Sequence, residues 1–404
     1  MKKSAVALGA MALASAAFAQ SSVTLFGVLD AGVSLYENKS QDVFGNTVKT
    51  SRTVMSNNGT TTSRLGFRGT EDLGGGLSAN FWLEAAIFVD DGTTGANVAN
   101  SGPAVNGLFS RRSTVSLAGP YGEVRLGRDF TPTNWNDSVF DPFTNVGSGT
   151  SLIATANGFS SSGAAVNGFQ ANNMYVRASN SVGYFLPPDL GGFYGQVMYA
   201  FNEQTKYDPG TLTPRVANNS RAGGYVGGRF GYTKGPWDIA IAYGEATLAD
   251  SYFAGLTTSL NTLSIGSYYD FQVVKISGEY WTAKLKTKND GPVPVVTDFI
   301  TPGADGYLLA AAIPVGPGLI RMSYSQVEMD HNVLQLNGTP KASKVALGYL
   351  HNLSKRTALY ATVAQINNRN GYDLGIGGSP QFYTSGTFQA RTSRGYDFGL
   401  RHVF

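Results

Sequence analysis

The stretch RGYDFGLRHVF, from Arg394 to Phe404, ends the sequence on a strict alternation of side chains. Tyr396, Phe398 and Leu400 share one parity, and small or polar residues occupy most of the other. Successive side chains of a β-strand point to opposite faces, so the alternation predicts a strand with one apolar and one polar face. Terminal residues usually fray. An aromatic last residue in such a strand therefore needs a structural reason.

The same period of two recurs after Gln20, for example in LSANFWLEAAI (77–87) and VVKISGEYW (273–281). Charged residues make up only 14% of the chain, whereas glycine contributes 51 residues and aromatic residues 12%. We find no apolar run of the roughly 18 residues that a membrane-spanning helix requires. This composition favours a chain rich in β-strands. The sheet of such a chain either exposes one face to water or closes into a barrel with lipid outside and water inside.

The connections between the predicted strands favour the barrel, because they alternate between short turns and long loops. Seven short turns and eight long loops join sixteen strands of the length that a tilted strand needs to cross the hydrocarbon layer. We therefore predict an all-β fold, a transmembrane 16-stranded antiparallel β-barrel with short periplasmic turns and long outer loops. The predicted turns are Glu71–Gly76, Gly119–Gly122, Pro187–Gly192, Lys234–Pro236, Asp270–Gln272, Pro314–Gly318 and Asn352–Arg356, and the predicted loops cover residues 37–62, 88–108, 130–175, 202–220, 249–257, 288–304, 330–343 and 366–393.

Closure of a barrel would also explain why the sequence ends on an aromatic residue within an alternating strand. Every backbone group must be hydrogen-bonded in lipid, so the last strand has to pair with the first. We expect Tyr396 and Phe398 to face lipid and Phe404 to lie at the periplasmic rim.

Residues 1–19 are predicted to be a cleaved signal peptide. Lys2 and Lys3 precede an apolar segment, and an A-x-A cleavage site follows at residues 17–19. Residues 20–404 would then form the barrel domain. Without those two lysines the chain holds 28 basic and 27 acidic residues, a balance that gives no support for a nucleic-acid partner. The sequence has no cysteine, which excludes disulfides.

Five blocks of sequence, in matching order between Ser21 and Phe404, resemble the trimeric general diffusion porins of Gram-negative outer membranes, of the β-proteobacterial type. The blocks are SSVTLFGVLDAGVSLY (21–36), SRLGFRGTEDLGGGLSA (63–79), RRSTVSLAGPYGEVRLGRDFTP (111–132), NSVGYFLPPDLGGF (180–193) and GLRHVF (399–404). The resemblance implies a homotrimer through which small hydrophilic solutes diffuse, with the third outer loop folded into the lumen. It also implies contact with outer-membrane lipid and lipopolysaccharide, and recognition of the terminal aromatic residues by the barrel-assembly machinery.

Alternation also predicts which charges line the pore, where fixed charge sets ion selectivity. Five arginines stand next to apolar residues that should face lipid, so they are predicted to point into the lumen. By the same rule Arg111 is predicted to point outward. The family pattern places an arginine cluster opposite the third loop, and Arg64, Arg112 and Arg177 match it. We expect a modest anion preference, unless these arginines pair with lumen acids such as Glu84. The five inward arginines are Arg64, Arg68, Arg112, Arg125 and Arg177.

The predicted third loop, residues 130–175, contains only two charged residues, Asp137 and Asp141. We predict that both carboxylates face the arginines and create a field across the lumen. Pro142 is expected to bend the loop, because proline fixes its own φ and favours an extended Asp141. The aromatic residues expected to pin the loop to the inner wall are Trp135, Phe140 and Phe143.

No catalytic activity, cofactor or metal site is predicted. The only histidines are His331, His351 and His402, and we find no nucleophile elbow, zinc-binding H-E-x-x-H or phosphate-binding loop. Two other functions remain possible on the same barrel. One is a substrate-specific channel that uses Trp82 and Trp281 as a binding rail, and the other is an adhesin or receptor that displays its outer loops.

Overall fold

The computed structural model describes residues 22–101, 104–158, 172–208, 210–211, 220–251, 256–289, 302–330 and 338–404. The predicted signal peptide, residues 1–19, lies outside these residues, so this prediction stays untested. His331 also lies outside them. Within the described ranges, no helix is both long enough and apolar enough to span a membrane.

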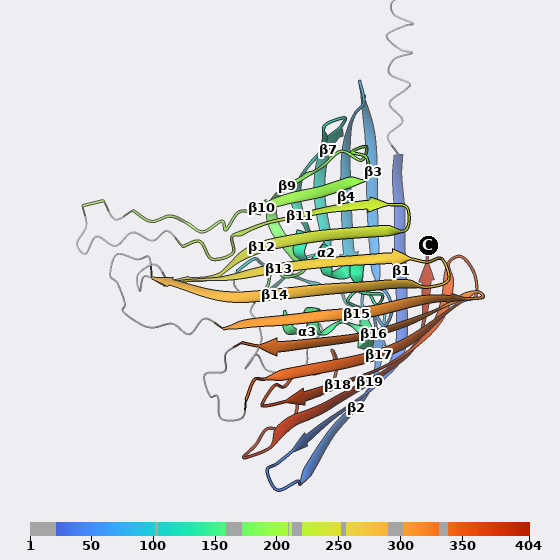
Figure 1. Cartoon of the computed structure of the whole chain (residues 1–404). Helices are drawn as coiled ribbons and strands as arrows, with labels where there is room; N and C mark the ends of the chain where they lie inside the picture. The colour runs from blue at the N-terminus through green and yellow to red at the C-terminus, as the bar shows by residue number, and fades with distance from the viewer. Residues whose placement is uncertain are drawn as a thin grey trace, which may run out of the picture.

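In the described part of the chain, seventeen strands form one antiparallel sheet that closes on itself (Figure 1). Two of them, β2 and β3, pair with successive halves of β1 and together make one barrel strand. The predicted 16-stranded antiparallel barrel is therefore confirmed. Its strands are β1 (Ser22–Gln41), β2 (Thr47–Asn57), β3 (Arg64–Gly74), β4 (Leu77–Ala86), β7 (Arg112–Gly119), β8 (Gly122–Phe130), β9 (Arg177–Phe185), β10 (Phe193–Ala200), β11 (Tyr225–Lys234), β12 (Trp237–Ser251), β13 (Leu256–Asp270), β14 (Lys275–Asn289), β15 (Gly303–Val315), β16 (Gly318–Met329), β17 (Lys341–Asn352), β18 (Thr357–Arg369) and β19 (Gln389–Val403), while β5 (Ala96–Val98) and β6 (Ala104–Asn106) form a separate hairpin.

All seven predicted short turns join consecutive strands at one end of the barrel (Figure 1). The predicted loop over residues 37–62 is wrong in most of its length, because β1 and β2 extend as a paired hairpin with its tip at residues 42–46. The segment looked like a loop because it is rich in Ser, Thr and Asn. Its five β-branched residues between Thr47 and Val54 nevertheless favour a strand.

The gap between β2 and β3 is a folded segment, residues 58–63, held by the buried carboxylate of Asp30. Thr60 and Thr61 donate their backbone N–H groups to that carboxylate at 2.9 and 2.7 Å. The Tyr360 hydroxyl donates to it at 2.6 Å. The break in this barrel strand is thus an internally hydrogen-bonded feature, as a backbone at membrane depth requires.

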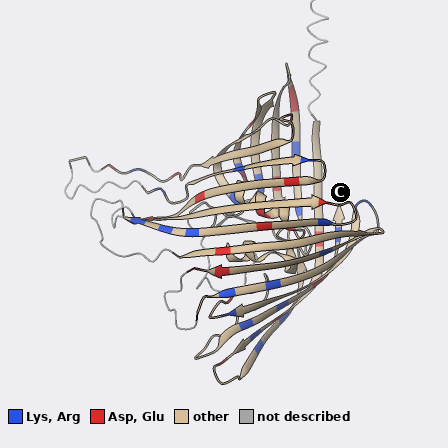
Figure 2. Cartoon of the chain, viewed as in Figure 1, with Lys and Arg blue, Asp and Glu red and all other residues tan. Residues whose placement is uncertain are grey.

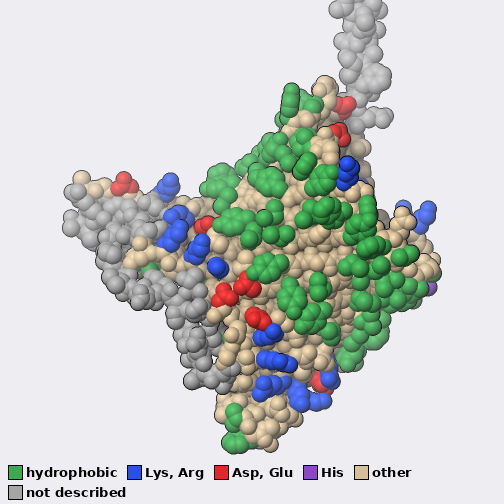
Figure 3. Space-filling view, viewed as in Figure 1, with side chains coloured by type: hydrophobic (Ala, Val, Ile, Leu, Met, Phe, Trp, Pro, Cys, Tyr) green, Lys and Arg blue, Asp and Glu red, His purple; other side chains and the backbone are tan. Residues whose placement is uncertain are grey.

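The outer surface has the composition of a lipid-facing wall. Hydrophobic side chains form green patches spread over the outer wall in the space-filling view (Figure 3). Many of the exposed hydrophobic residues are aromatic, and these occur toward both ends of the strands. Such paired aromatic girdles mark the two membrane interfaces of outer-membrane barrels. The residues toward the loop end include Tyr243, Tyr280, Tyr307 and Tyr324, and those toward the turn end include Phe193, Trp237, Tyr269 and Phe271.

The seam between β1 and β19 explains the aromatic terminus. The strands pair from Val28 opposite Val403 onward, and Phe404 adds two backbone hydrogen bonds with Gly27, of 3.0 and 3.1 Å. The Phe404 ring lies over Gly27, where a Cβ would come within 2.3 Å of it. Phe398 is 52% exposed on the lipid face, and Tyr396 is exposed beside it, as predicted. The last residue therefore completes the closure of the barrel.

We expect Gly27→Ala to weaken this seam, because the added methyl group displaces the Phe404 ring. Overpacking of this kind costs about 1–3 kcal/mol. The measurement is the temperature at which the folded barrel loses its compact electrophoretic mobility. Gly278→Ala is the control, since the nearest atom to its Cβ is 3.5 Å away. An equal loss in both variants would contradict the role assigned to the Gly27–Phe404 contact.

Candidate functional site

The described part of the third loop, residues 130–158 and 172–175, lies inside the barrel, as predicted. It contains helix α2 (Pro132–Phe140), the 3-10 turn η1 (Gly147–Gly149) and helix α3 (Leu152–Ala156). Thr131 caps α2 and Pro132 begins it, an arrangement typical of helix N-termini. Helix α2 packs against β11–β14, α3 against β15–β17 and η1 against β17–β19. The loop therefore follows one side of the barrel wall (Figure 1).

Two of the three predicted aromatic anchors hold the loop to that wall. Phe140 and Phe143 are fully buried, and their rings occupy the spaces that the wall glycines Gly266 and Gly348 leave open. Trp135 does not act as an anchor, because it is 45% exposed and contacts only the ring edge of Phe130 among the described aromatic residues. The loop is thus pinned by rings that fit glycine positions in strands β13 and β17.

The prediction that Asp137 and Asp141 face the arginines is wrong. Asp137 is 1% exposed, and it accepts a hydrogen bond of 2.8 Å from the Tyr175 hydroxyl. Asp141 is also buried and accepts backbone N–H groups of Phe143, Asn145 and Ser151 at 2.9–3.2 Å. Both carboxylates serve the internal structure of the loop and its contact with the wall, so the loop does not present them to the lumen.

The predicted bend at Pro142 is present. Helix α2 ends at Phe140, Asp141 has an extended backbone with φ −87° and ψ 117°, and Thr144 donates its N–H to the Asp141 carbonyl at 2.8 Å. Asp141 therefore forms the start of a tight turn, which explains why its side chain turns back toward backbone N–H groups.

Four arginines gather near the loop end of the opposite wall, and we call them the loop-side cluster: Arg64, Arg111, Arg128 and Arg177. The last three line a cavity of about 360 Å³ together with residues of the third loop. The Arg111 Nε–H donates to Glu84 at 2.5 Å, and Arg64 lies within electrostatic range of both. Arg177 stacks over the Phe130 ring at 4.2 Å, and its buried Nε has no hydrogen-bond partner.

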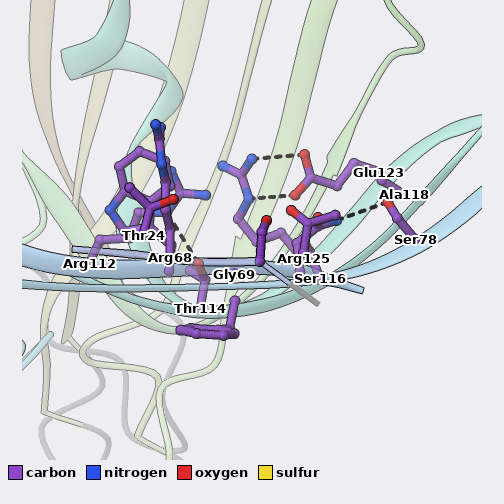
Figure 4. Close-up of a pocket in the computed structure, with 15 residues that line it drawn as sticks. Thr24, Arg68, Gly69, Ser78, Arg112, Thr114, Ser116, Ala118, Glu123 and Arg125 are labelled. Atoms are coloured by element: carbon purple, nitrogen blue, oxygen red, sulfur yellow. Dashed lines mark hydrogen bonds and ion pairs between the residues drawn. The ribbon is translucent and has the colours of Figure 1, made fainter. Parts of the chain in front are cut away.

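The other three predicted arginines form a separate group nearer the short turns, the turn-side niche of Arg68, Arg112 and Arg125 (Figure 4). They line a cavity of about 560 Å³. Arg68 and Arg112 lie over the Trp82 ring, at 5.3 and 4.5 Å from its centre. Arg125 is neutralised by ion pairs of 2.9 Å with Glu123 and 2.6 Å with Asp129. The five predicted inward arginines therefore divide between two sites.

Arg111, which was predicted to point outward, belongs to the loop-side cluster in the place expected of Arg112. It is 6% exposed and paired with Glu84. The alternation misled because β7 begins at Arg112, and Arg111 precedes the strand. Arg128 was missed as well: it donates to the Ser110 carbonyl and the Ser179 hydroxyl, both at 2.7 Å. The register shift next to it, between Gly127 and Asp129, could not be read from the sequence.

A sequence model of the Gram-negative porin family matches residues 4–371 of this chain. The chain belongs to this family. It is 37% identical over the full length of both chains to outer membrane porin protein 32 of Delftia acidovorans. It is 29% identical to an outer membrane porin protein of Bordetella pertussis, over 89% of this chain and 93% of that one. This porin therefore forms a water-filled diffusion channel in the outer membrane, as the sequence blocks implied.

Solved structures agree with the assignment. The anion-selective porin from Comamonas acidovorans matches with a TM-score of 0.71 and 34% identity, over 95% of this chain and all of that one. OmpT of Vibrio cholerae matches with a TM-score of 0.59 at 12% identity, over 95% of this chain and 98% of that one, a likeness of fold alone.

We expect Glu84→Gln to raise the ratio of anion to cation permeability of the porin. The substitution removes the negative charge beside Arg111 and Arg64 and leaves both guanidinium groups in place. The measurement is the reversal potential of reconstituted channels in a salt gradient. Glu328→Gln, on the outer wall, is the control and should leave the ratio unchanged. A ratio that stays constant in Glu84→Gln would show that this pair does not affect the permeating ions.

Proposed function

We propose that this porin is a homotrimeric general diffusion channel with a preference for anions, and that it passes solutes without acting on them chemically. The observation that carries the proposal is the loop-side cluster, in which four guanidinium groups gather where the third loop crosses the lumen. Arginine suits this task because it stays charged at every working pH and offers a planar set of donors to carboxylate or phosphate.

The distribution of charge in the loop also supports anion preference. The two carboxylates of the loop are buried in its own structure and against the wall. The loop therefore offers passing cations no acidic surface to balance the arginines across the lumen. We predicted an electric field between the loop carboxylates and the wall arginines. With the carboxylates buried, we instead expect a positive potential on the arginine side of the lumen. The anion-selective porin from Comamonas acidovorans, to which this chain is similar, supports the same assignment.

The homotrimer is proposed from the family, since a structure of Vibrio cholerae OmpT is described as a trimer form. The outer face of β1 and β2 suits subunit contact, because Val33, Leu35 and Met55 are exposed apolar residues there. Closure of reconstituted channels in three equal steps supports a trimer, and closure in a single step contradicts it.

We expect the variant Arg64→Ser, Arg111→Ser, Arg177→Ser to lose most of its anion preference. The matched control replaces Arg68, Arg112 and Arg125 by serine. The control removes the same number of positive charges from the turn-side niche, which the third loop does not line, so it should change selectivity less. The measurement is the reversal potential of single channels over a range of salt gradients. Cation preference in the unaltered porin, or equal effects of the two triple variants, would overturn the proposal.

The alternative of a substrate-specific channel with a rail of Trp82 and Trp281 finds less support. Trp281 is fully buried in the cluster of core residues beneath the third loop, where a passing solute cannot reach it. Trp82 lines the turn-side niche between two arginines. A rail of two accessible tryptophans is therefore not formed in the described part of the lumen.

We also propose that lipopolysaccharide binds the outer wall at Lys284, Lys286 and Lys288. These lysines are exposed on the outward face of β14, at its loop end (Figure 2). They follow Tyr280 of the aromatic girdle, the depth at which lipid phosphates are expected. No described residue forms a salt bridge with them.

Replacing all three lysines by glutamine should reduce the lipopolysaccharide that copurifies with the porin, because each loses its attraction to a phosphate. The measurement is lipid phosphate per protein after detergent extraction. Lys234→Gln, in the turn-side part of the chain, is the control. Unchanged lipopolysaccharide in the triple variant would contradict the site.

Recognition by the barrel-assembly machinery is proposed for the terminal strand β19. Tyr396, Phe398 and Phe404 expose apolar surface on one face of this strand. An unfolded chain that carries these residues presents a short aromatic signature at alternate positions of one strand.

A further inference from the structure

Helix α2 of the third loop meets the barrel wall through two carboxyl groups. Asp137 on α2 is 1% exposed and Glu279 on β14 is 5% exposed, and the two side chains are within hydrogen-bond contact of each other. They come from segments more than a hundred residues apart in the sequence, so their contact is a feature of the loop's position in the lumen. Two acidic groups in such a place demand an explanation, since buried like charges repel strongly.

The hydrogen bonds of the two carboxyl groups indicate how they can lie in contact. One oxygen of Asp137 accepts from the Tyr175 hydroxyl at 2.8 Å, while its other oxygen, Oδ1, is buried and has no partner. Oε1 of Glu279 is likewise buried without a partner. Ionised carboxylates only accept hydrogen bonds, so two of them cannot satisfy each other. A proton held between the two groups turns one of them into a donor and resolves the contact.

Basic groups on the elements packed around α2 do not neutralise the pair. Arg229 of β11 lies within electrostatic range of Glu279, but it donates to Asn136 at 2.9 Å and to the Tyr194 hydroxyl at 3.0 Å. Lys275 of β14 lies over the Tyr268 ring, 4.2 Å from its centre. No salt bridge among the described residues includes Asp137 or Glu279.

The remaining titratable groups near the pair are acids and phenols. Asp141, at the end of α2, adds negative potential to Glu279. Tyr225 of β11 bonds Thr133 of the loop at 3.2 Å, and Asp238 of β12 accepts from Tyr194 of β10 at 2.6 Å. None of them supplies a positive charge, so the surroundings favour retention of the shared proton.

We propose that Asp137 and Glu279 share a proton and that this carboxyl pair is the tie that positions the constriction helix α2 against the wall. Both are positioning residues: they act on permeation through the place of the loop and do not contact the solute. Loss of the last shared proton leaves two anions in contact and releases α2 into the lumen. The inference rests on the channel function but is independent of its ion preference.

The sign of the pH dependence follows from burial. Burial raises the pKa of Asp137 to about 6, well above the ordinary value of an aspartate. An acid with a raised pKa stabilises the folded arrangement at low pH and loses that contribution as pH rises through the raised value. The two carboxyl groups hold their last shared proton most strongly, because its loss would leave two anions in contact. The tie should therefore fail only at alkaline pH.

The test is single-channel recording as pH rises from about 6 to about 10, a range that spans titration of a strongly raised carboxyl. We expect the current noise of the open channel to increase at the alkaline end, because a released α2 moves within the lumen. In Glu279→Gln the amide donates to Asp137 at any pH, so the noise should stay low throughout. Glu328→Gln, on the outer wall, is the control and should behave like the unaltered porin.

A noise level that does not change with pH in the unaltered porin would overturn the tie, as would a Glu279→Gln variant with the same alkaline rise. Reversal potentials recorded on the same channels keep this outcome separate from ion preference. Channels without anion preference that still become noisy at alkaline pH would contradict the proposed selectivity and support the tie.

Infrared difference spectra supply a second readout that does not depend on permeation. At neutral pH the unaltered porin should show the carbonyl band of a protonated carboxylic acid, and this band should be weaker in Glu279→Gln. Asp137→Asn serves as the second variant if Glu279→Gln fails to fold, and it should weaken the same band. Identical spectra of the unaltered porin and a folded variant would show that the pair holds no proton.

Discussion

The closed ladder of backbone hydrogen bonds is the constraint on which the rest of this structure depends. Hydrocarbon offers no partner for an exposed N–H or C=O group, so a sheet in lipid is stable only when its last strand pairs with its first. In this chain the requirement is met by β1 and β19, and the two hydrogen bonds of Phe404 with Gly27 finish the ladder. A fixed frame of this kind allows the irregular third loop to lie inside the barrel.

The wall of the barrel and the loop divide the charges between them in an unexpected way. Arginines line two cavities on the wall of β3–β9, although Arg111 and Arg128 are themselves buried, whereas the acids of the loop are withdrawn into turns and wall contacts. Withdrawal costs desolvation, which the hydrogen bonds of Asp141 with three backbone N–H groups offset. The electrostatics of the lumen therefore depend on how the loop folds as much as on which residues it contains.

Sequence alternation predicted most of the strands and the lipid face, because the period of two governs both, and the short gaps between strands predicted the seven turns. It could not predict features that lie where the period is interrupted. Arg111 stands one residue before its strand, and Arg128 stands at a register shift. The direction of Asp137 and Asp141 depends on a short helix and a capped turn within the loop. A long loop without regular alternation carries no signal for either of them.

One signal for the position of the loop was nevertheless present in the sequence. A loop can lie against a wall only where the inward side chains are small, because cores pack to high density and large residues exclude each other. The inward positions that receive Phe140 and Phe143 are Gly266 and Gly348, and Gly395 lies against Ser148 of η1. Basic residues occur on both walls, since Arg229 donates to Asn136 and Arg321 lies over the Phe143 ring on the side that the loop occupies. The glycines that receive loop residues therefore mark the position of the loop better than the basic residues do.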